Sequence, residues 1–166
     1  MKKILLGLLA LGLTTQFMFS QIIELSEVRI AVNYKYLDAI NSEEVAVPVK
    51  MLEEKVAFYN LKDSDLYSDE YDMYTINFFI PEGKIVAAYD KDGKILRTIE
   101  KFKDIKLPKD VLYSVAERFP NWTIEEDVYR VSYNEKSGNA RKEYKIRLRN
   151  GDKTMVIKVN EKGEFL

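Results

Sequence analysis

A strand–turn–strand pattern near the middle of the chain constrains its fold most. Residues 84–89 are mostly apolar, residues 90–93 read Asp-Lys-Asp-Gly, and a second strand-like segment runs from residue 94 to 102. Asp and Gly are common in hairpin turns because they tolerate positive φ. The pattern therefore predicts a β-hairpin, which must join further strands to bury one of its faces.

The same pattern returns 70 residues later along the chain. Tyr74 matches Tyr144 at this offset, and in the same way Asp90 matches Asn160 and Gly93 matches Gly163. A fixed offset shared by several residue types indicates a duplicated unit.

Hydrophobic spacing predicts the remaining elements. Apolar residues three or four apart predict helices over residues 48–59 and 108–119, and both segments begin near a proline, which suits the first helical turn. Alternation predicts strands over residues 71–80, 128–133, 142–149 and 154–159. Val28, Ile30, Val32 and Tyr34 also alternate with more polar residues, and we therefore predict another strand over residues 22–36.

Residues 1–20 have the pattern of a secretory signal peptide. Lys2 and Lys3 precede an apolar run over residues 4–13, which is shorter than the roughly 20 residues that span a membrane. We expect cleavage after Ser20 and a mature chain without a membrane span. With no cysteine to carry a lipid anchor, the protein is expected in the periplasm or secreted.

The absence of two residue types narrows the chemistry. The chain has no Cys and no His, which removes disulfides, thiol catalysis, imidazole metal ligands and the Ser-His-Asp triad. No phosphate-binding glycine loop is present. We therefore predict a non-enzyme with no cofactor and no metal site. Without residues 1–20 the net charge is −3, and we expect no nucleic-acid partner.

Charge is distributed unevenly along the chain. Residues 38–72 carry a net charge of −7, whereas residues 135–166 carry +4. The basic residues alternate along predicted strands and are expected on one sheet face. They either form a solvated face that discourages pairing of sheet edges or a docking surface for an acidic partner. The candidate contact face consists of Lys145, Arg147, Arg149, Lys158, Tyr129 and Tyr133.

Several of these segments together resemble a known family. Gly83-Lys84-Ile85, the segment from Ala88 to Lys94, Leu107-Pro108, Phe119-Pro120-Asn121-Trp122 and Asn150-Gly151 are similar to the PepSY-like family of small exported proteins, typical of the Bacteroidetes envelope. That family is similar in fold to the beta-lactamase inhibitory protein. The resemblance implies an α+β fold, a tandem helix-plus-antiparallel-sheet repeat with halves of about 21–105 and 106–166. It implies no settled activity and no catalytic residues.

Two hypotheses for function follow. The first is an exported, non-catalytic binding module that holds an envelope or secreted protein on an exposed sheet face, since Tyr and Arg are favoured at interfaces. The second is an envelope protein that binds a small ligand or cation through the acidic segment 63–72, whose carboxylates are suitable calcium ligands.

Overall fold

The computed structural model describes residues 27–166, and their side chains from residue 33 onward. The signal peptide predicted for residues 1–20 lies outside the described residues. The elements are, in chain order, α2 (Glu27–Ile40), α3 (Val47–Ala57), β1 (Met73–Ile80), β2 (Gly83–Asp90), β3 (Ile95–Lys103), α4 (Lys109–Arg118), β4 (Thr123–Asn134), β5 (Asn139–Asn150) and β6 (Lys153–Val159).

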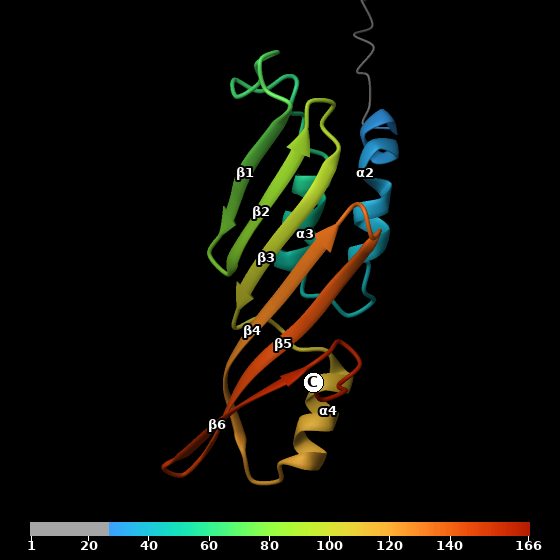
Figure 1. Cartoon of the computed structure of the whole chain (residues 1–166). Coiled ribbons are helices and arrows are strands. Elements are labelled where there is room, and N and C mark those ends of the chain that lie inside the picture. The colour runs from blue at the N-terminus through green and yellow to red at the C-terminus, as the bar shows by residue number, and fades with distance from the viewer. Residues whose placement is uncertain (1–26) are drawn as a thin grey trace, which may run out of the picture.

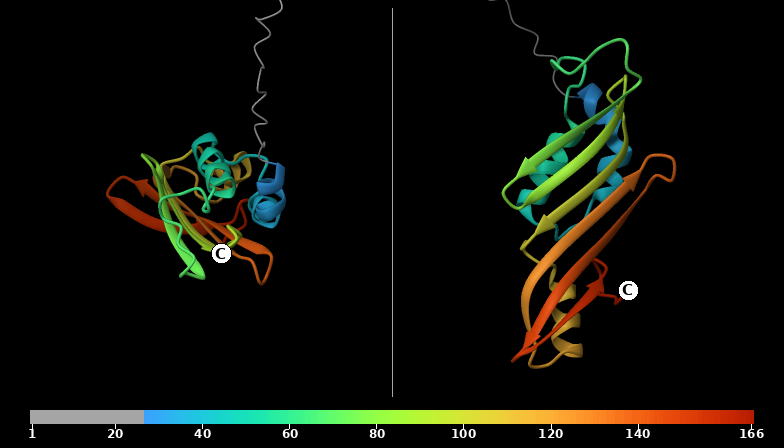
Figure 2. Two further views of the ribbon diagram at one scale, coloured as in Figure 1. Left: turned by 90° about the horizontal axis from the view of Figure 1, so that it is seen from above. Right: turned by 60° about the vertical axis from the view of Figure 1, so that its left-hand side comes forward.

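The strands form one antiparallel sheet in the order of the sequence, β1-β2-β3-β4-β5-β6. The helices gather on one side of this sheet and leave the other side open (Figures 1 and 2). Although α4 interrupts the chain between β3 and β4, these two strands still pair with each other. The fold is therefore α+β, with a helix layer on the inner face of a single sheet.

The first predicted strand is wrong. Where the structure describes that segment, from residue 27 onward, it is part of helix α2. The buried residues Asn33, Tyr36 and Ile40 of α2 follow each other at spacings of three and four, which is helical. Tyr34, the last apolar residue of the alternation that we interpreted as a strand, lies between Asn33 and Tyr36 and is 56% exposed. None of the helices in residues 27–166 is long and apolar enough to cross a membrane.

Asn33 ties α2 to two other parts of the fold. Its backbone is non-helical and marks a kink in α2. The amide Nδ2 donates to the carbonyl of Ala57, 2.9 Å away, and to that of Gly93, while Oδ1 accepts from the backbone N–H of Ile95 at 2.8 Å. A buried amide with all these partners satisfied fixes α2 against the end of α3 and the β2–β3 turn.

Tyrosine dominates the core between the helix layer and the sheet. Five tyrosines are at most 2% exposed: Tyr36, Tyr89, Tyr129, Tyr133 and Tyr144. The rings of Tyr129 and Tyr144, which are directly opposite on β4 and β5, stack with their centroids 4.5 Å apart. Tyr36 of α2 meets Tyr133 edge to face at 5.4 Å. The aromatic richness of the sequence is thus used largely inside the protein.

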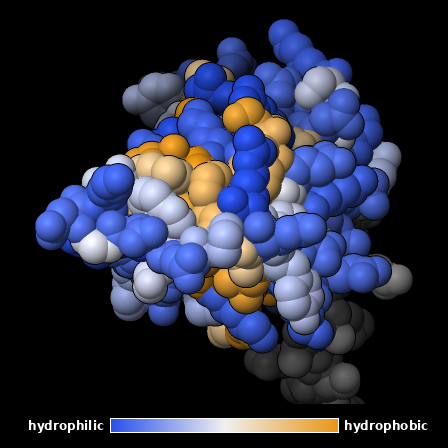
Figure 3. Space-filling view, turned by 90° about the horizontal axis from the view of Figure 1, so that it is seen from below, coloured by the Kyte–Doolittle hydropathy of each residue, from blue (hydrophilic) through white to orange (hydrophobic). Residues whose placement is uncertain are grey.

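The helix layer closes the two ends of the core unequally. Helix α3 buries Val49, Leu52, Val56 and two further residues, whereas α4 buries only Val111 and Val115. Around α4 the apolar residues Phe119, Trp122, Ile124, Met155, Ile157 and Phe165 stay partly buried. Seen from the end that carries α4 and the β5–β6 hairpin, apolar side chains reach the surface in a band bordered by hydrophilic ones (Figure 3).

The two matching turns have the same geometry. In the first turn Asp90 accepts backbone N–H bonds from Asp92 and Lys94 with one side-chain oxygen, each at 2.9 Å. In the second turn Asn160 accepts from Lys162 and Glu164 in the same way, at 2.9 and 3.0 Å. Gly93 and Gly163 both adopt positive φ, 81° and 77°. The 70-residue offset therefore joins turns that are alike in hydrogen bonding and in backbone conformation.

Candidate functional site

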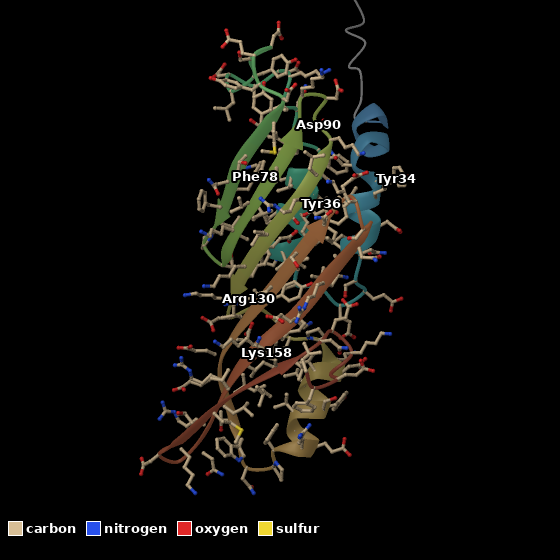
Figure 4. The ribbon with its side chains drawn as sticks, viewed as in Figure 1. Tyr34, Tyr36, Phe78, Asp90, Arg130 and Lys158 are labelled. Carbon is tan, nitrogen blue, oxygen red and sulfur yellow. The ribbon has the colours of Figure 1, made fainter. Side chains whose placement is uncertain are left out.

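The outer face of the sheet, opposite the helix layer, is strongly basic. Side chains alternate along each strand, so that residues of one parity point away from the helices. The exposed basic residues of this parity define the basic sheet face: Lys84, Arg97, Lys101, Lys103, Arg130, Arg141, Lys145, Arg147, Arg149 and Lys158. Two of them, Arg130 and Lys158, are labelled in Figure 4.

Strand register places like charges directly opposite one another on this face. Lys84 of β2 pairs with Lys101 of β3, which in turn pairs with Arg130 of β4. Lys145 of β5 likewise pairs with Lys158 of β6. Opposite residues of neighbouring strands have Cβ atoms about 5 Å apart, and like charges at that distance destabilise a sheet.

Acidic residues neutralise only part of the basic sheet face. Glu125 bonds Arg149, Glu126 lies 3.5 Å from Arg147, and Glu143 lies 3.4 Å from Arg141 and 3.8 Å from Lys158. The other six basic residues have no ion pair within residues 33–166: Lys84, Arg97, Lys101, Lys103, Arg130 and Lys145. Most of the unpaired charge therefore lies on β2, β3 and β4, in the middle of the sheet.

The face is hollowed where this unpaired charge is densest. One depression of about 440 Å³ lies over β3 to β6 and includes Ile99 and Lys158. A second, of about 270 Å³, includes Lys145 and Val156. Lys101 and Arg130 line both depressions. Ile99 and Val156 are 54% and 52% exposed, so the surface combines cations with apolar contacts.

The structure separates the six residues of the contact face predicted from the sequence. Lys145, Arg147, Arg149 and Lys158 are exposed on the outer face. Tyr129 and Tyr133 are not on it: each is 1% exposed, and both point into the core beneath the helices. From Glu126 onward, the odd-numbered residues of β4 face inward and the even-numbered ones outward, so its outer face carries Arg130 instead of these tyrosines.

The basic residues of β2 and β3 were not predicted from the sequence. Lys84, Lys101 and Lys103 lie far from the basic segment in the sequence, and only strand order brings them beside β4. The alternation of Arg97, Ile99, Lys101 and Lys103 with buried Thr98, Glu100 and Phe102 was the available signal.

A second polar cluster lies on the inner face, beneath α2 and α3. Glu53 of α3 and Glu100 of β3 are 3% and 1% exposed. Oε1 of Glu100 accepts hydrogen bonds from the Tyr36 hydroxyl at 3.0 Å and from the Thr98 hydroxyl at 2.7 Å. Glu53 Oε1 and Glu100 Oε2 receive no bond from another described residue. The two carboxyl groups lie within reach of each other, and a proton on one of them supplies the donor that both otherwise lack.

Burial explains why this acid pair holds a proton. Loss of water, and to a lesser extent the neighbouring Glu100, together raise the pKa of Glu53 from 4.5 to about 9. Burial also raises the pKa of Glu100, opposed by its bonds from Thr98 and Tyr36. Lys142, whose side chain is 8% exposed, favours the charged form of both but forms an ion pair with Glu161 at 3.1 Å. The pair therefore carries at most one negative charge at neutral pH.

The carboxylates of the acidic segment 63–72 do not gather into one cluster. Within residues 33–166 no group of three or more carboxylates could hold a metal ion. The segment instead packs through its aromatic residues: Tyr67 stacks on Tyr74 of β1, and Tyr71 meets the same ring edge to face. The Tyr74 hydroxyl bonds the backbone of Ser68. These contacts fasten the segment to the start of β1.

Comparison with known proteins does not add a family. No protein-family model, no curated protein and no solved structure matches this chain. The fold and the site define it as an α+β protein with a six-stranded antiparallel sheet, helices on one face and a basic, hollowed surface on the other.

Proposed function

We propose that the chain is an exported, non-catalytic binding module that holds an acidic protein on its basic sheet face. The main support for this proposal is the row of like charges formed by Lys84, Lys101 and Arg130 across three adjacent strands. Each such pair costs the sheet a few tenths of a kcal/mol, up to about 1. Residues that lower stability are retained where function requires them. An anionic partner bound to this row would relieve the repulsion between its cations.

The position of these charges argues against a purely protective role. Charges that prevent sheets from pairing are useful on edge strands. Lys101 and Arg130 lie on β3 and β4, which are the two central strands of the sheet. Their side chains are available to a ligand above the face and do not guard an edge.

A protein fits this surface better than a nucleic acid. Ile99 and Val156 expose apolar side chains among the cations, as protein interfaces do. Proteins that bind single strands stack bases on aromatic side chains. Phe79 is the single aromatic residue of the outward-facing parity in the described strands, and it lies on the edge strand β1.

The duplicated turns support the proposed family. The matching hydrogen bonds around Asp90 and Asn160 fit a tandem repeat with halves of about 21–105 and 106–166, as in PepSY-like proteins. Export through a signal peptide at residues 1–20 belongs to the same proposal. The alternative, a ligand or cation site in segment 63–72, has no observation in its favour.

Fluorescence anisotropy with a labelled acidic peptide, rich in Glu with interspersed Leu, tests the proposal. Lys101→Glu/Arg130→Glu should weaken binding at least about tenfold, because both depressions lose their shared cations and two charge contacts of a few tenths to about 1 kcal/mol each are reversed. Raised salt should also weaken wild-type binding.

The matched control is Lys55→Glu/Lys109→Glu, which changes net charge equally in the helix layer. It should bind as the wild type does. Equal losses in both variants would show that only net charge matters. Tighter binding of a labelled single-stranded DNA than of the peptide would replace the protein partner with a nucleic acid. No binding by the wild type at low salt would refute an acidic partner.

A further inference from the structure

Strand β1 leaves one edge of the sheet open. Its only strand partner is β2, and no backbone hydrogen bond joins Met73–Ile80 to any other described residue. The pairing with β2 runs through all eight residues without a bulge. The β1 sequence, MYTINFFI, contains no charged residue and no proline. Proteins usually protect an edge strand with bulges, charged residues or proline. Strand β1 has none of these, so its open edge is available for pairing.

The opposite edge is protected. Strand β6 contains Lys153 and Lys158, and charged side chains discourage edge pairing. The chain end also folds over it: Val159 bridges Phe165, and the N–H of Leu166 bonds the carbonyl of Lys158 at 3.0 Å. The contrast between the two edges marks β1 as the one built for association.

We propose that β1 pairs with β1 of a second copy of this chain, antiparallel about a two-fold axis at Ile76. In this register Met73 lies opposite Phe79, and Thr75 lies opposite Asn77. Met73 and Phe79 are 61% and 66% exposed in the single chain and would cover each other in the pair. The register also keeps Pro81 outside the pairing, so that the contact joins two sheets into one with all helices on the same face.

Charge favours a second copy as the occupant. Lys84 pairs with Phe79, and Asp90 pairs with Met73 within one chain. Joining Phe79 of one copy to Met73 of the other therefore continues the basic row of Lys84 toward Asp90 of the partner copy. No like charges meet across the two β1 strands, because β1 itself carries none.

Sedimentation velocity over a concentration series tests this pairing. The variants carry charged residues in place of Thr75 and Asn77, the two exposed polar residues of β1. The wild type should shift from monomer to dimer as concentration rises. Thr75→Lys/Asn77→Lys places like charges opposite each other twice per dimer and should raise the dimer dissociation constant about tenfold or more. Thr75→Lys/Asn77→Glu places opposite charges in the same positions and should dimerise at least as well as the wild type.

Thr75→Lys/Asn77→Glu is the control for damage to the fold, because it alters the same two residues as the Lys/Lys variant but places opposite charges across the proposed contact. If both variants dimerise equally, the contact lies elsewhere. A wild type that stays monomeric at every concentration overturns the proposal. Thr75→Lys/Asn77→Glu changes none of the residues that define the basic sheet face and leaves the net charge unchanged, so acidic-peptide binding measured on this variant is independent of this result.

Discussion

The two faces of one sheet treat like charge in opposite ways. On the inner face, Glu53 and Glu100 meet in the core beneath two helices. On the outer face, Lys84, Lys101 and Arg130 meet in the open. Neither group has enough counter-charge among its neighbours, although Glu143 of β5 lies opposite Arg130. The inner pair keeps a proton, because burial makes a second negative charge too costly. The outer row is tolerated because water screens it, and it remains free to meet an anion.

This difference separates a structural role from a binding role. The acid pair links α2, α3 and β3 through Tyr36, Glu53 and Glu100. It cannot reach a partner, since both carboxyl groups are buried. The outer row can reach a partner but adds nothing to the core. Variants of the two regions should therefore change different properties of the protein.

The largest expected effect is the pH dependence of stability set by the acid pair. The pKa of Glu53 is raised from 4.5 to about 9, so that the folded state holds a proton that the unfolded chain releases above pH 4.5. The free energy of unfolding should therefore fall as pH rises from 4.5 to about 9, by an amount on the order of several kcal/mol. Urea unfolding at pH 5, 7 and 9 measures it.

Glu53→Gln sharpens this result. The amide cannot ionise but still donates a hydrogen bond to Glu100. The variant should lose most of the pH dependence and be more stable than the wild type at pH 9. A wild-type free energy of unfolding that rises between pH 5 and 9 would contradict a shared proton.

The second effect, of middle size, concerns the cost of the outer row. Lys101→Glu turns two repulsive pairs, with Lys84 and with Arg130, into attractive ones. The free energy of unfolding should rise by roughly 1 kcal/mol, while binding of the acidic peptide weakens. Chemical unfolding at low and at high salt measures the gain, which should shrink as salt screens the charges. A destabilised variant would show that Lys101 has a structural partner.

The smallest expected effect separates the hydrogen bonds of the acid pair from its proton. Tyr36→Phe removes the hydroxyl that donates to Glu100 at 3.0 Å. It should cost roughly 0.5 kcal/mol, because Glu100 Oε1 keeps its hydrogen bond from Thr98. Peptide binding should stay unchanged, because the outer face is not altered. Parallel loss of stability and of binding in this variant would connect the two faces.

Much of the fold follows from sequence periodicity. The segments 71–80, 142–149 and 154–159 were predicted as strands, and the structure confirms them, as it does helices α3 and α4. The prediction of the first strand was wrong because a run of only four alternating apolar residues does not decide between strand and helix, and packing against the sheet favours the helix. The net charge of −3 over residues 21–166 argued against a nucleic-acid partner but did not reveal the basic face, because acidic residues elsewhere offset it.

The sequence predicts which residues of a single strand share a face, but not which strands lie side by side to form the candidate site. Alternation in β5 correctly places Lys145, Arg147 and Arg149 outward. Tyr129 and Tyr133 were assigned to the same face because aromatic residues are common at interfaces, but their strand neighbours Val131 and Phe102 belong to the core. The row from Lys84 to Arg130 depends on strand order, which no local pattern encodes.

The most direct test of the account is an NMR titration of the ¹⁵N- and methyl-labelled protein with the acidic peptide. The account predicts chemical-shift changes at Ile99, Lys101, Arg130 and Val156, on the outer face of β3, β4 and β6, with little change in α3 and α4. Changes confined to the helix layer, or spread evenly over every exposed lysine, would contradict a binding site on the open face of the sheet.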